Sequence, residues 1–152
     1  MDTSRRRLIG LLALPMVLAL IGAACTSGGT PTPPTVNVTV QEWAVLPAAT
    51  SAAAGRITFT VKNVGPDDVH EFVVIKTDLD AYALPTDGTG AAEEGASGTE
   101  VMGEIEDIAV GSTENLTLEL AAGHYAIICN VYTAAENESH YKLGMATNFT
   151  VN

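Results

Sequence analysis

The alternation of apolar and polar residues constrains the fold of this chain more than any other feature. It begins at residue 36, and the runs 36–45 and 56–63 follow a period of two. This period is typical of strands with one buried face, and no stretch shows the period of an amphipathic helix. Further strands are predicted over 69–77, 113–120, 124–129 and 146–151. Short strands separated by turns predict an all-β fold, a Greek-key antiparallel β-sandwich of about seven strands.

The length of 152 residues allows one domain with short appendages. We predict an export signal over residues 1–25, a tether over 26–35 and the β-domain over 36–152. One stretch of the domain departs from the strand pattern, because residues 78–99 are rich in Gly, Ala, Thr and acidic side chains. This composition predicts a long mobile insertion with one helical turn.

The N-terminal residues carry the pattern of an export signal. Arg5, Arg6 and Arg7 precede an almost wholly apolar stretch, residues 8–24, which is short for a permanent membrane span and contains Gly and Pro. Residues 4–9 resemble the twin-arginine motif, whose pathway exports folded proteins; an ordinary secretory signal with three arginines is the alternative. Export predicts a place at the extracytoplasmic face of a bacterial cell membrane, in the periplasm or at the cell surface.

The predicted signal ends in a cysteine. Residues 21–25 resemble the box that precedes the lipidated Cys of bacterial lipoproteins, although Gly22 stands where Leu is usual. Residues 26–35 are rich in Thr, Pro and Gly, a composition typical of a flexible, partly extended tether. We therefore predict lipidation of Cys25 and attachment of the domain to the membrane through this lipid anchor.

Cys25 and Cys129 are the two cysteines of the chain. If Cys25 is lipidated or removed, Cys129 has no disulfide partner. A lone thiol outside the cytoplasm is either buried and inert or held as a ligand. His70, His140 and Met145 offer two imidazoles and a thioether to complete such a site. A thiolate, two imidazoles and a distant thioether are the ligand set of blue-copper electron-transfer sites.

Residues 36–152 resemble the cupredoxin family over nearly their whole length. The resemblance is carried by Glu42-Trp43, by the strands 55–63 and 70–74, by residues 123–129 leading to Cys129, and by the loop from His140 to Met145 with Gly144 before the Met. It implies a β-sandwich that binds one copper ion, cycling between Cu(I) and Cu(II).

The resemblance also implies roles for the four candidate ligands. His70, Cys129 and His140 would be the equatorial ligands and Met145 the axial one. Two features depart from the family pattern: ten residues separate Cys129 from His140, and Glu71 follows His70 where many members carry Asn or Ser. The hydrogen bond between the ligand loops is therefore missing or replaced, and Glu71 is a candidate to approach the metal.

Two further residues are given no part in the site. His124 follows a Gly turn and faces away from Cys129 by strand parity. Trp43 is assigned to the core rather than to an electron path.

Three functions are compatible with these residues. The first is electron transport without catalysis, by outer-sphere transfer through an exposed edge of His140. The second is copper storage or delivery outside the cytoplasm with the same ligands. The third is a β-sandwich without metal, used for adhesion or structure. Three histidines and one available cysteine are too few for multicopper oxidases, copper nitrite reductases or binuclear copper sites, so electron transport is the first hypothesis. We also predict a monomer.

The charge of the chain indicates the kind of partner. Beyond residue 25, four basic residues stand against 17 acidic ones. A surface of this sign repels nucleic acids and anionic lipids and attracts basic proteins, although it also fits solubility or adaptation to salt. We predict a redox protein partner, such as a c-type cytochrome or a membrane oxidoreductase, and no nucleic acid.

Overall fold

The computed structural model describes residues 33–152. The export signal predicted over 1–25, the lipidation of Cys25 and the tether up to residue 32 lie outside the described residues. Within residues 33–152, no helix is both long enough and apolar enough to cross a membrane. The first strand begins at Thr35, one residue before the predicted start of the domain.

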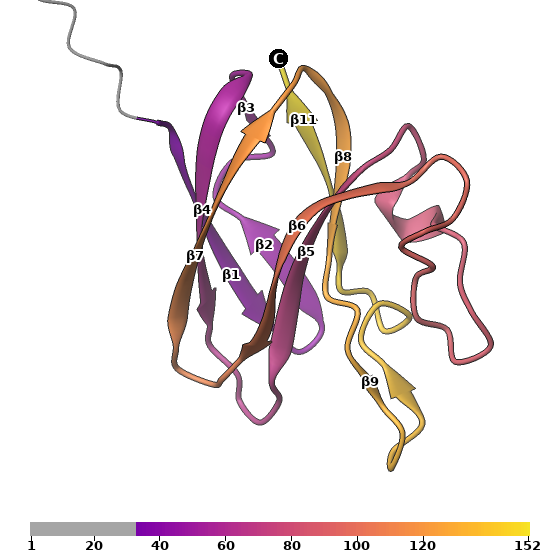
Figure 1. Ribbon diagram of the computed structural model, residues 1–152. Coiled ribbons are helices and arrows are strands. Elements are labelled where there is room, and N and C mark those ends of the chain that lie inside the picture. Colours follow the sequence, from indigo (N-terminus) through magenta and orange to yellow (C-terminus); the bar gives the residue numbers. More distant parts are fainter. Residues whose placement is uncertain (1–32) are drawn as a thin grey trace, which may run out of the picture. The chain divides into compact units, whose positions relative to one another are not determined.

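The described residues form strands and one short 3-10 turn, which confirms the all-β prediction (Figure 1). In chain order the elements are β1 (Thr35–Gln41), β2 (Ala44–Pro47), β3 (Ser51–Ala52), β4 (Gly55–Asn63), β5 (His70–Lys76), η1 (Ala81–Ala83), β6 (Glu100–Ile108), β7 (Thr113–Leu120), β8 (Gly123–Ile128), β9 (Tyr132–Thr133), β10 (Glu138–Ser139) and β11 (Ala146–Val151).

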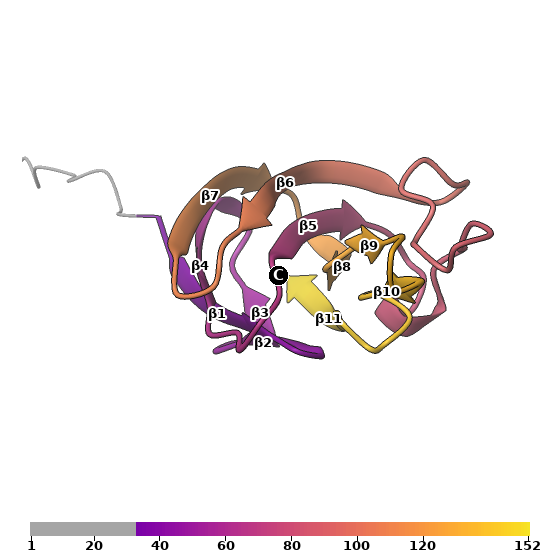
Figure 2. The ribbon, with the colours of Figure 1, turned by 90° about the horizontal axis from the view of Figure 1, so that it is seen from below.

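These strands form two layers of a sandwich (Figure 2). A four-stranded sheet has the order β2-β1-β4-β7, a five-stranded sheet has the order β3-β11-β8-β5-β6, and β9 and β10 form a separate hairpin. The chain crosses repeatedly between the two sheets, as the predicted β-sandwich requires.

Two details of the prediction are wrong. The described part of the chain holds eleven strands rather than about seven, because β3, β9 and β10 have only two residues each and the mostly exposed β6 lacks a clear alternation. The pairing is also not purely antiparallel: β1 is parallel to β4, and β3 is parallel to β11. Between β1 and β4 the chain crosses to the opposite sheet and back, so it returns beside β1 in the same direction.

The predicted first run, 36–45, is a hairpin rather than one strand. It reverses at Glu42 and Trp43, and β2 then pairs antiparallel with β1. The sequence contains a signal for this turn, because the buried positions of β1 are even-numbered up to Val40, whereas Val45 in β2 is buried at an odd number. A change of parity within an alternating run indicates a turn or a bulge.

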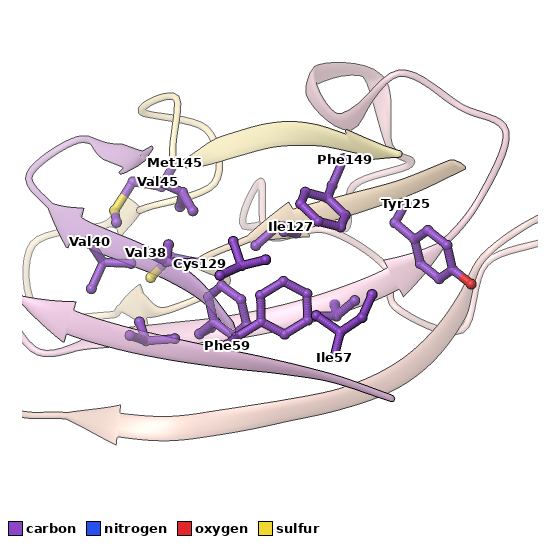
Figure 3. Close-up of a cluster of buried hydrophobic side chains, with 14 of the residues drawn as sticks. Val38, Val40, Val45, Ile57, Phe59, Tyr125, Ile127, Cys129, Met145 and Phe149 are labelled. Atoms are coloured by element: carbon purple, nitrogen blue, oxygen red, sulfur yellow. The ribbon is translucent and has the colours of Figure 1, made fainter. Parts of the chain in front are cut away.

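The main hydrophobic core lies between the two sheets. Phe59, Phe72 and Phe149 are at most 1% exposed and their rings pack against one another with centroids 5.4 and 5.6 Å apart. Each such side chain contributes roughly 1.5–3 kcal/mol by burial. Figure 3 shows the sulfur atoms of Cys129 and Met145 toward one end of the core, with Phe59 nearer its middle and Phe149 beyond.

A second cluster covers the outer face of the five-stranded sheet. Val73, Ile75 and Ile128 point to this face and are fully buried under the segment 78–99 and Tyr141. The Tyr141 hydroxyl donates to the carbonyl of Ala81 at 2.9 Å and accepts from the Leu84 N–H at 2.9 Å. The predicted helical turn is present as η1, but the segment is a packed cover that explains why β5 and β8 are apolar on both faces.

Candidate metal centre

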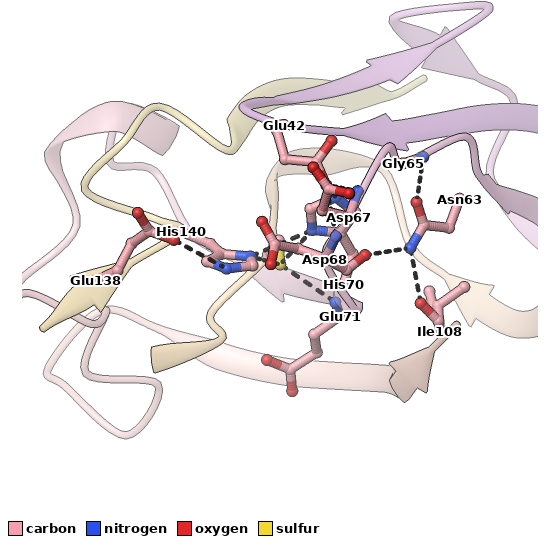
Figure 4. A network of polar contacts seen from close by, with 11 residues as sticks. Glu42, Asn63, Gly65, Asp67, Asp68, His70, Glu71, Ile108, Glu138 and His140 are labelled. Carbon is pink, nitrogen blue, oxygen red and sulfur yellow. Dashed lines mark hydrogen bonds and ion pairs between the residues drawn. The ribbon is translucent and has the colours of Figure 1, made fainter. Parts of the chain in front are cut away.

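His70, Cys129 and His140 meet at one end of the sandwich, although they come from distant parts of the chain (Figure 4). His70 is the first residue of β5, and Cys129 directly follows β8, which pairs with β5. His140 directly follows β10. The Cys129 Sγ lies 3.4 Å from Nδ1 of His140 and 3.8 Å from Nδ1 of His70, and the two Nδ1 atoms are 3.2 Å apart.

These three atoms have the spacing of metal ligands. The point equidistant from them lies about 2.0 Å from each atom, close to the 2.0–2.3 Å bond lengths of a first-row ion to His nitrogen and Cys sulfur. The side chains are 0%, 0% and 1% exposed for His70, Cys129 and His140. The geometry thus fits one ion enclosed by a thiolate and two imidazoles.

Met145 is the fourth predicted ligand and lies at the same end of the core. Its side chain is fully buried, and its sulfur is drawn near this end in Figure 3. The Met145 N–H donates to the carbonyl of His140 at 3.1 Å, and the Cys129 N–H donates to the carbonyl of Met145 at 3.0 Å. These two bonds fix the loop from His140 to Met145 beside Cys129; the ligand role of the thioether stays a prediction.

The outer nitrogen of each histidine faces a carboxylate. Nε2 of His70 lies 3.8 Å from Oε1 of Glu42, and Nε2 of His140 lies 3.9 Å from Oε1 of Glu138. Burial lowers the pKa of both imidazoles below the usual value, so they are neutral near pH 7. A carboxylate beside Nε2 favours the tautomer with the proton on that atom, which leaves the lone pair of Nδ1 free for a metal.

The thiol of Cys129 is protonated in the metal-free protein. Burial raises its pKa to about 11, and the backbone N–H of Glu71 opposes this shift. That N–H donates to Sγ at 3.2 Å. Since a metal binds the thiolate, binding displaces a proton from this sulfur.

Glu71 does not approach the ligand cluster. Figure 4 shows its carboxylate directed away from the sulfur, and its oxygen instead lies within 4.8 Å of those of Glu94 and Glu104. The reason is strand geometry, because neighbouring residues of a strand point to opposite faces. A hydrogen bond between the ligand segments is present in another form. The N–H of Glu71, next to His70, donates to the sulfur of Cys129.

Two residues that the sequence reasoning missed hold the loop before His70. Oε1 of Glu42 accepts hydrogen bonds from the N–H groups of Asp67 and Asp68 at 3.1 and 2.8 Å. Burial raises the pKa of Glu42, but these backbone bonds outweigh it and the pKa is lowered. The buried Asn63 donates to the carbonyls of Asp68 and Ile108, at 2.8 Å each. The alternation of β4 places Asn63 on the buried face of the strand. A buried polar side chain needs hydrogen-bond partners, so this position could have indicated its structural role from sequence.

The residue after Cys129, Asn130, holds the segment 78–99. Asn130 accepts from the Ala92 N–H at 2.7 Å, and its amide donates to the Ala92 carbonyl at 3.0 Å and to Glu94 at 2.8 Å. The pKa of Glu71 is raised to about 7, mainly by burial and next by repulsion from Glu94 and Glu104. This face of β5 is therefore acidic and tied to the insertion.

His140 has no exposed edge, contrary to prediction, because its side chain is only 1% exposed. Trp43 packs on it edge-on, with the ring centroids 5.0 Å apart and the planes at 71°. Trp43 also packs against the main core, as predicted. His124 lies on the exposed start of β8 and belongs to no ligand cluster among residues 33–152.

Comparison with known proteins supports the fold. No family model matches the chain, and no curated protein matches it by sequence. Among solved structures, reduced auracyanin from the photosynthetic bacterium Roseiflexus castenholzii is 23% identical, with a TM-score of 0.54 over 78% of this chain and 96% of that one. Auracyanin A, a blue copper protein of Chloroflexus aurantiacus, is 23% identical with a TM-score of 0.53, over 80% of this chain and 100% of that one.

Reduced rusticyanin is 18% identical, with a TM-score of 0.52 over 80% of this chain and 82% of that one. All three are cupredoxins. The described domain therefore has the cupredoxin fold.

Proposed function

We propose that this protein is an exported mononuclear copper protein that carries single electrons between redox partners. The ion would be held by His70, Cys129, His140 and Met145. The observation that carries this proposal is the triangle of two Nδ1 atoms and one Sγ, with edges of 3.2, 3.4 and 3.8 Å, formed by side chains that are at most 1% exposed. Copper bound to this donor set supplies a one-electron couple, because thiolate suits Cu(I) and imidazole suits both oxidation states.

The protein contributes a donor set that is fixed in place. Carboxylates of Glu42 and Glu138 lie 3.8 and 3.9 Å from the outer nitrogens of His70 and His140. The Glu71 N–H holds the sulfur, and backbone bonds fix the loop from His140 to Met145. Ligands that do not rearrange between oxidation states reduce the barrier to electron exchange. The same enclosure supports a carrier rather than an enzyme, since a substrate has no open path to an ion whose equatorial ligands are at most 1% exposed. It also disfavours copper delivery, which requires an acceptor to reach the ion.

We further propose that the domain works outside the cytoplasm as a monomer. The tether 26–35 would join it to the membrane through a lipid on Cys25. Residues 4–9, as a twin-arginine motif, would direct its export. The excess of 17 acidic over four basic residues beyond residue 25 supports a basic redox partner. A c-type cytochrome and a membrane oxidoreductase are the candidate classes. Attraction of this kind raises the association rate and weakens as salt is added.

A copper titration tests the proposal. Cu(II) added to the metal-free protein is expected to give an intense visible thiolate-to-copper absorption that saturates at one equivalent, is bleached by a reductant and returns on reoxidation. Tight Cu(I) binding with weak colour and ready transfer to a chelator would instead favour storage or delivery. The absence of any copper binding would leave a structural β-sandwich.

A further inference from the structure

The four candidate ligands are at most 1% exposed. His70, Cys129 and Met145 are fully buried. Next to Cys129, Asn130 is bonded to Ala92 and Glu94 of the segment 78–99. His140, which was expected to provide the exchange edge, is itself covered. A redox partner therefore has to exchange electrons through a residue that is not a ligand.

Trp43 is placed to be that residue, although the sequence assigned it to the core rather than to an electron path. It is the sole tryptophan of the chain, and its ring meets the ring of His140 with centroids 5.0 Å apart. Trp43 is only partly buried, so the same side chain contacts a ligand and reaches solvent. The rings of the two candidate ligands His70 and His140 also pack on each other. Within residues 33–152, Trp43 is the one aromatic residue outside the ligand set whose ring packs on a candidate ligand.

The turn that carries Trp43 is anchored to the site on both sides. Glu42, the preceding residue, is bonded to the N–H groups of Asp67 and Asp68, before His70. The ligand loop passes along the other side, where a Cβ added to Gly144 would lie 3.7 Å from the Trp43 carbonyl. Glu42 thus lies beside His70 and Trp43 beside His140, and the backbone of this turn is held next to both ligand segments.

We propose that Trp43 is the residue through which electrons pass between the metal centre and a partner, an inference that rests on the proposed copper site. One electron crosses in each event: a one-electron donor protein is oxidised while Cu(II) is reduced to Cu(I), or the reverse. The indole acts as a bridge between the His140 ring and the partner, is not itself oxidised, and no bond forms or proton moves. Carboxylates of Asp68 and Glu138 beside His140 give this area a negative charge, which suits a cationic donor.

Stopped-flow reduction of the Cu(II) protein by hexaammineruthenium(II), a cationic one-electron donor, tests this role. The wild type is compared with Trp43→Phe, which keeps an aromatic ring, and Trp43→Leu, which does not. Tyr82→Leu is the matched control, because Tyr82 is 61% exposed and lies in η1. The reduction potential of each variant is measured so that rates are compared at equal driving force. We expect the rate to fall in the order wild type, Phe, Leu, by about an order of magnitude overall, with no change in the control.

The outcomes separate this inference from the proposed function. A wild type without the visible copper band would refute the copper site itself. An intact band with equal rates in the wild type and Trp43→Phe and Trp43→Leu would overturn the role of Trp43 alone, and so would a faster rate, which would mean that the indole only shields His140. If Trp43→Leu does not hold copper, the comparison of wild type with Trp43→Phe decides.

Tryptophan fluorescence provides a second readout that needs no electron donor. Because Trp43 is the sole tryptophan and contacts a candidate ligand, its emission should be quenched in proportion to bound Cu(II) and saturate at one equivalent. Emission that is indifferent to copper, in a protein that shows the visible band, would contradict contact between the indole and the metal centre.

Discussion

His70 and Glu71 are neighbours on β5, yet they belong to two different clusters of potential ligands. On the inner face, His70 joins Cys129 and His140; on the outer face, Glu71 joins Glu94 and Glu104. Each cluster brings three possible ligand atoms within 4.8 Å of one another. The inner groups are almost completely buried, whereas Glu104 is exposed and the other two carboxylates are partly so.

The difference lies in what surrounds the donors. The inner cluster has neutral imidazoles, a carboxylate within 4 Å of the outer nitrogen of each, and an N–H directed at the sulfur. The outer cluster consists of three carboxylates, and burial followed by repulsion from Glu94 raises the pKa of both Glu71 and Glu104. Proximity alone therefore does not make a metal site: the surroundings must leave the right lone pairs free and hold them in place.

Removing one member from each cluster should have opposite results. Cys129→Ala is expected to abolish the visible copper band and stoichiometric binding, because the thiolate is the donor that selects copper. Glu94→Gln is the matched variant of the outer cluster and should keep both. Absorption titration and a copper assay of the desalted protein measure this. If Cys129→Ala still bound one equivalent of copper and Glu94→Gln did not, the ion would lie on the outer face.

Residues that support the inner cluster should affect copper affinity less than the candidate ligands themselves do, but by a measurable amount. Glu42→Ala removes the acceptor of the Asp67 and Asp68 N–H groups and the carboxylate beside His70. Loss of such a support typically costs about 10–100-fold in metal affinity. Competition with a copper chelator measures the change, with Glu114→Ala, on an exposed strand position, as control. Equal affinities in the two variants would show that His70 is held in place without Glu42.

Much of the fold and the members of the inner cluster were predictable from sequence, and their surroundings were not. Alternation predicted β4 and β7, whereas apolar and β-branched runs predicted β5 and β8. The three ligand candidates that meet are rare residue types in this chain. The burial of His140 was missed because it depends on Trp43, which reaches it only through the turn at residues 42–43. The direction of Glu71 was readable from strand parity alone.

The cover of the outer face was also unpredictable, since residues 78–99 have the composition of a loop. Their place is fixed by side chains outside the segment, namely Asn130, Ser139 and Tyr141, which bond to its backbone. No local pattern within the segment encodes those contacts.

Detaching this cover should destabilise the domain. Asn130→Ala removes hydrogen bonds to Ala92 and Glu94 and leaves backbone groups without partners, at a cost of about 1–3 kcal/mol. Urea unfolding of the metal-free protein measures the loss. Asn115→Ala is the matched control, because Asn115 makes one exposed hydrogen bond with Thr60 and should lose less. Equal losses would mean that the segment is held by apolar packing alone.

The smallest effect is expected from relieving the repulsion in the outer cluster. Burial and then Glu94 raise the pKa of Glu104, and the pKa of Glu71 is raised to about 7. Carboxyls with a higher pKa in the folded chain bind protons more tightly there, so they stabilise the fold below pH 4.5 and this contribution is lost as the pH rises through about 7. Glu104→Gln removes one of these charges. The free energy of unfolding of this variant should therefore fall less than that of the wild type as the pH rises from 4.5 to about 7.

Because Glu104 is exposed, solvent screening limits the gain to about 0.5 kcal/mol at pH 7. Unfolding of the metal-free protein at several pH values measures it, with the exposed Glu93→Gln as control. A gain that is the same at pH 4 and pH 7 would mean that the substitution acts by packing or propensity, since relief of charge repulsion has to vanish where the carboxyls are protonated in both states.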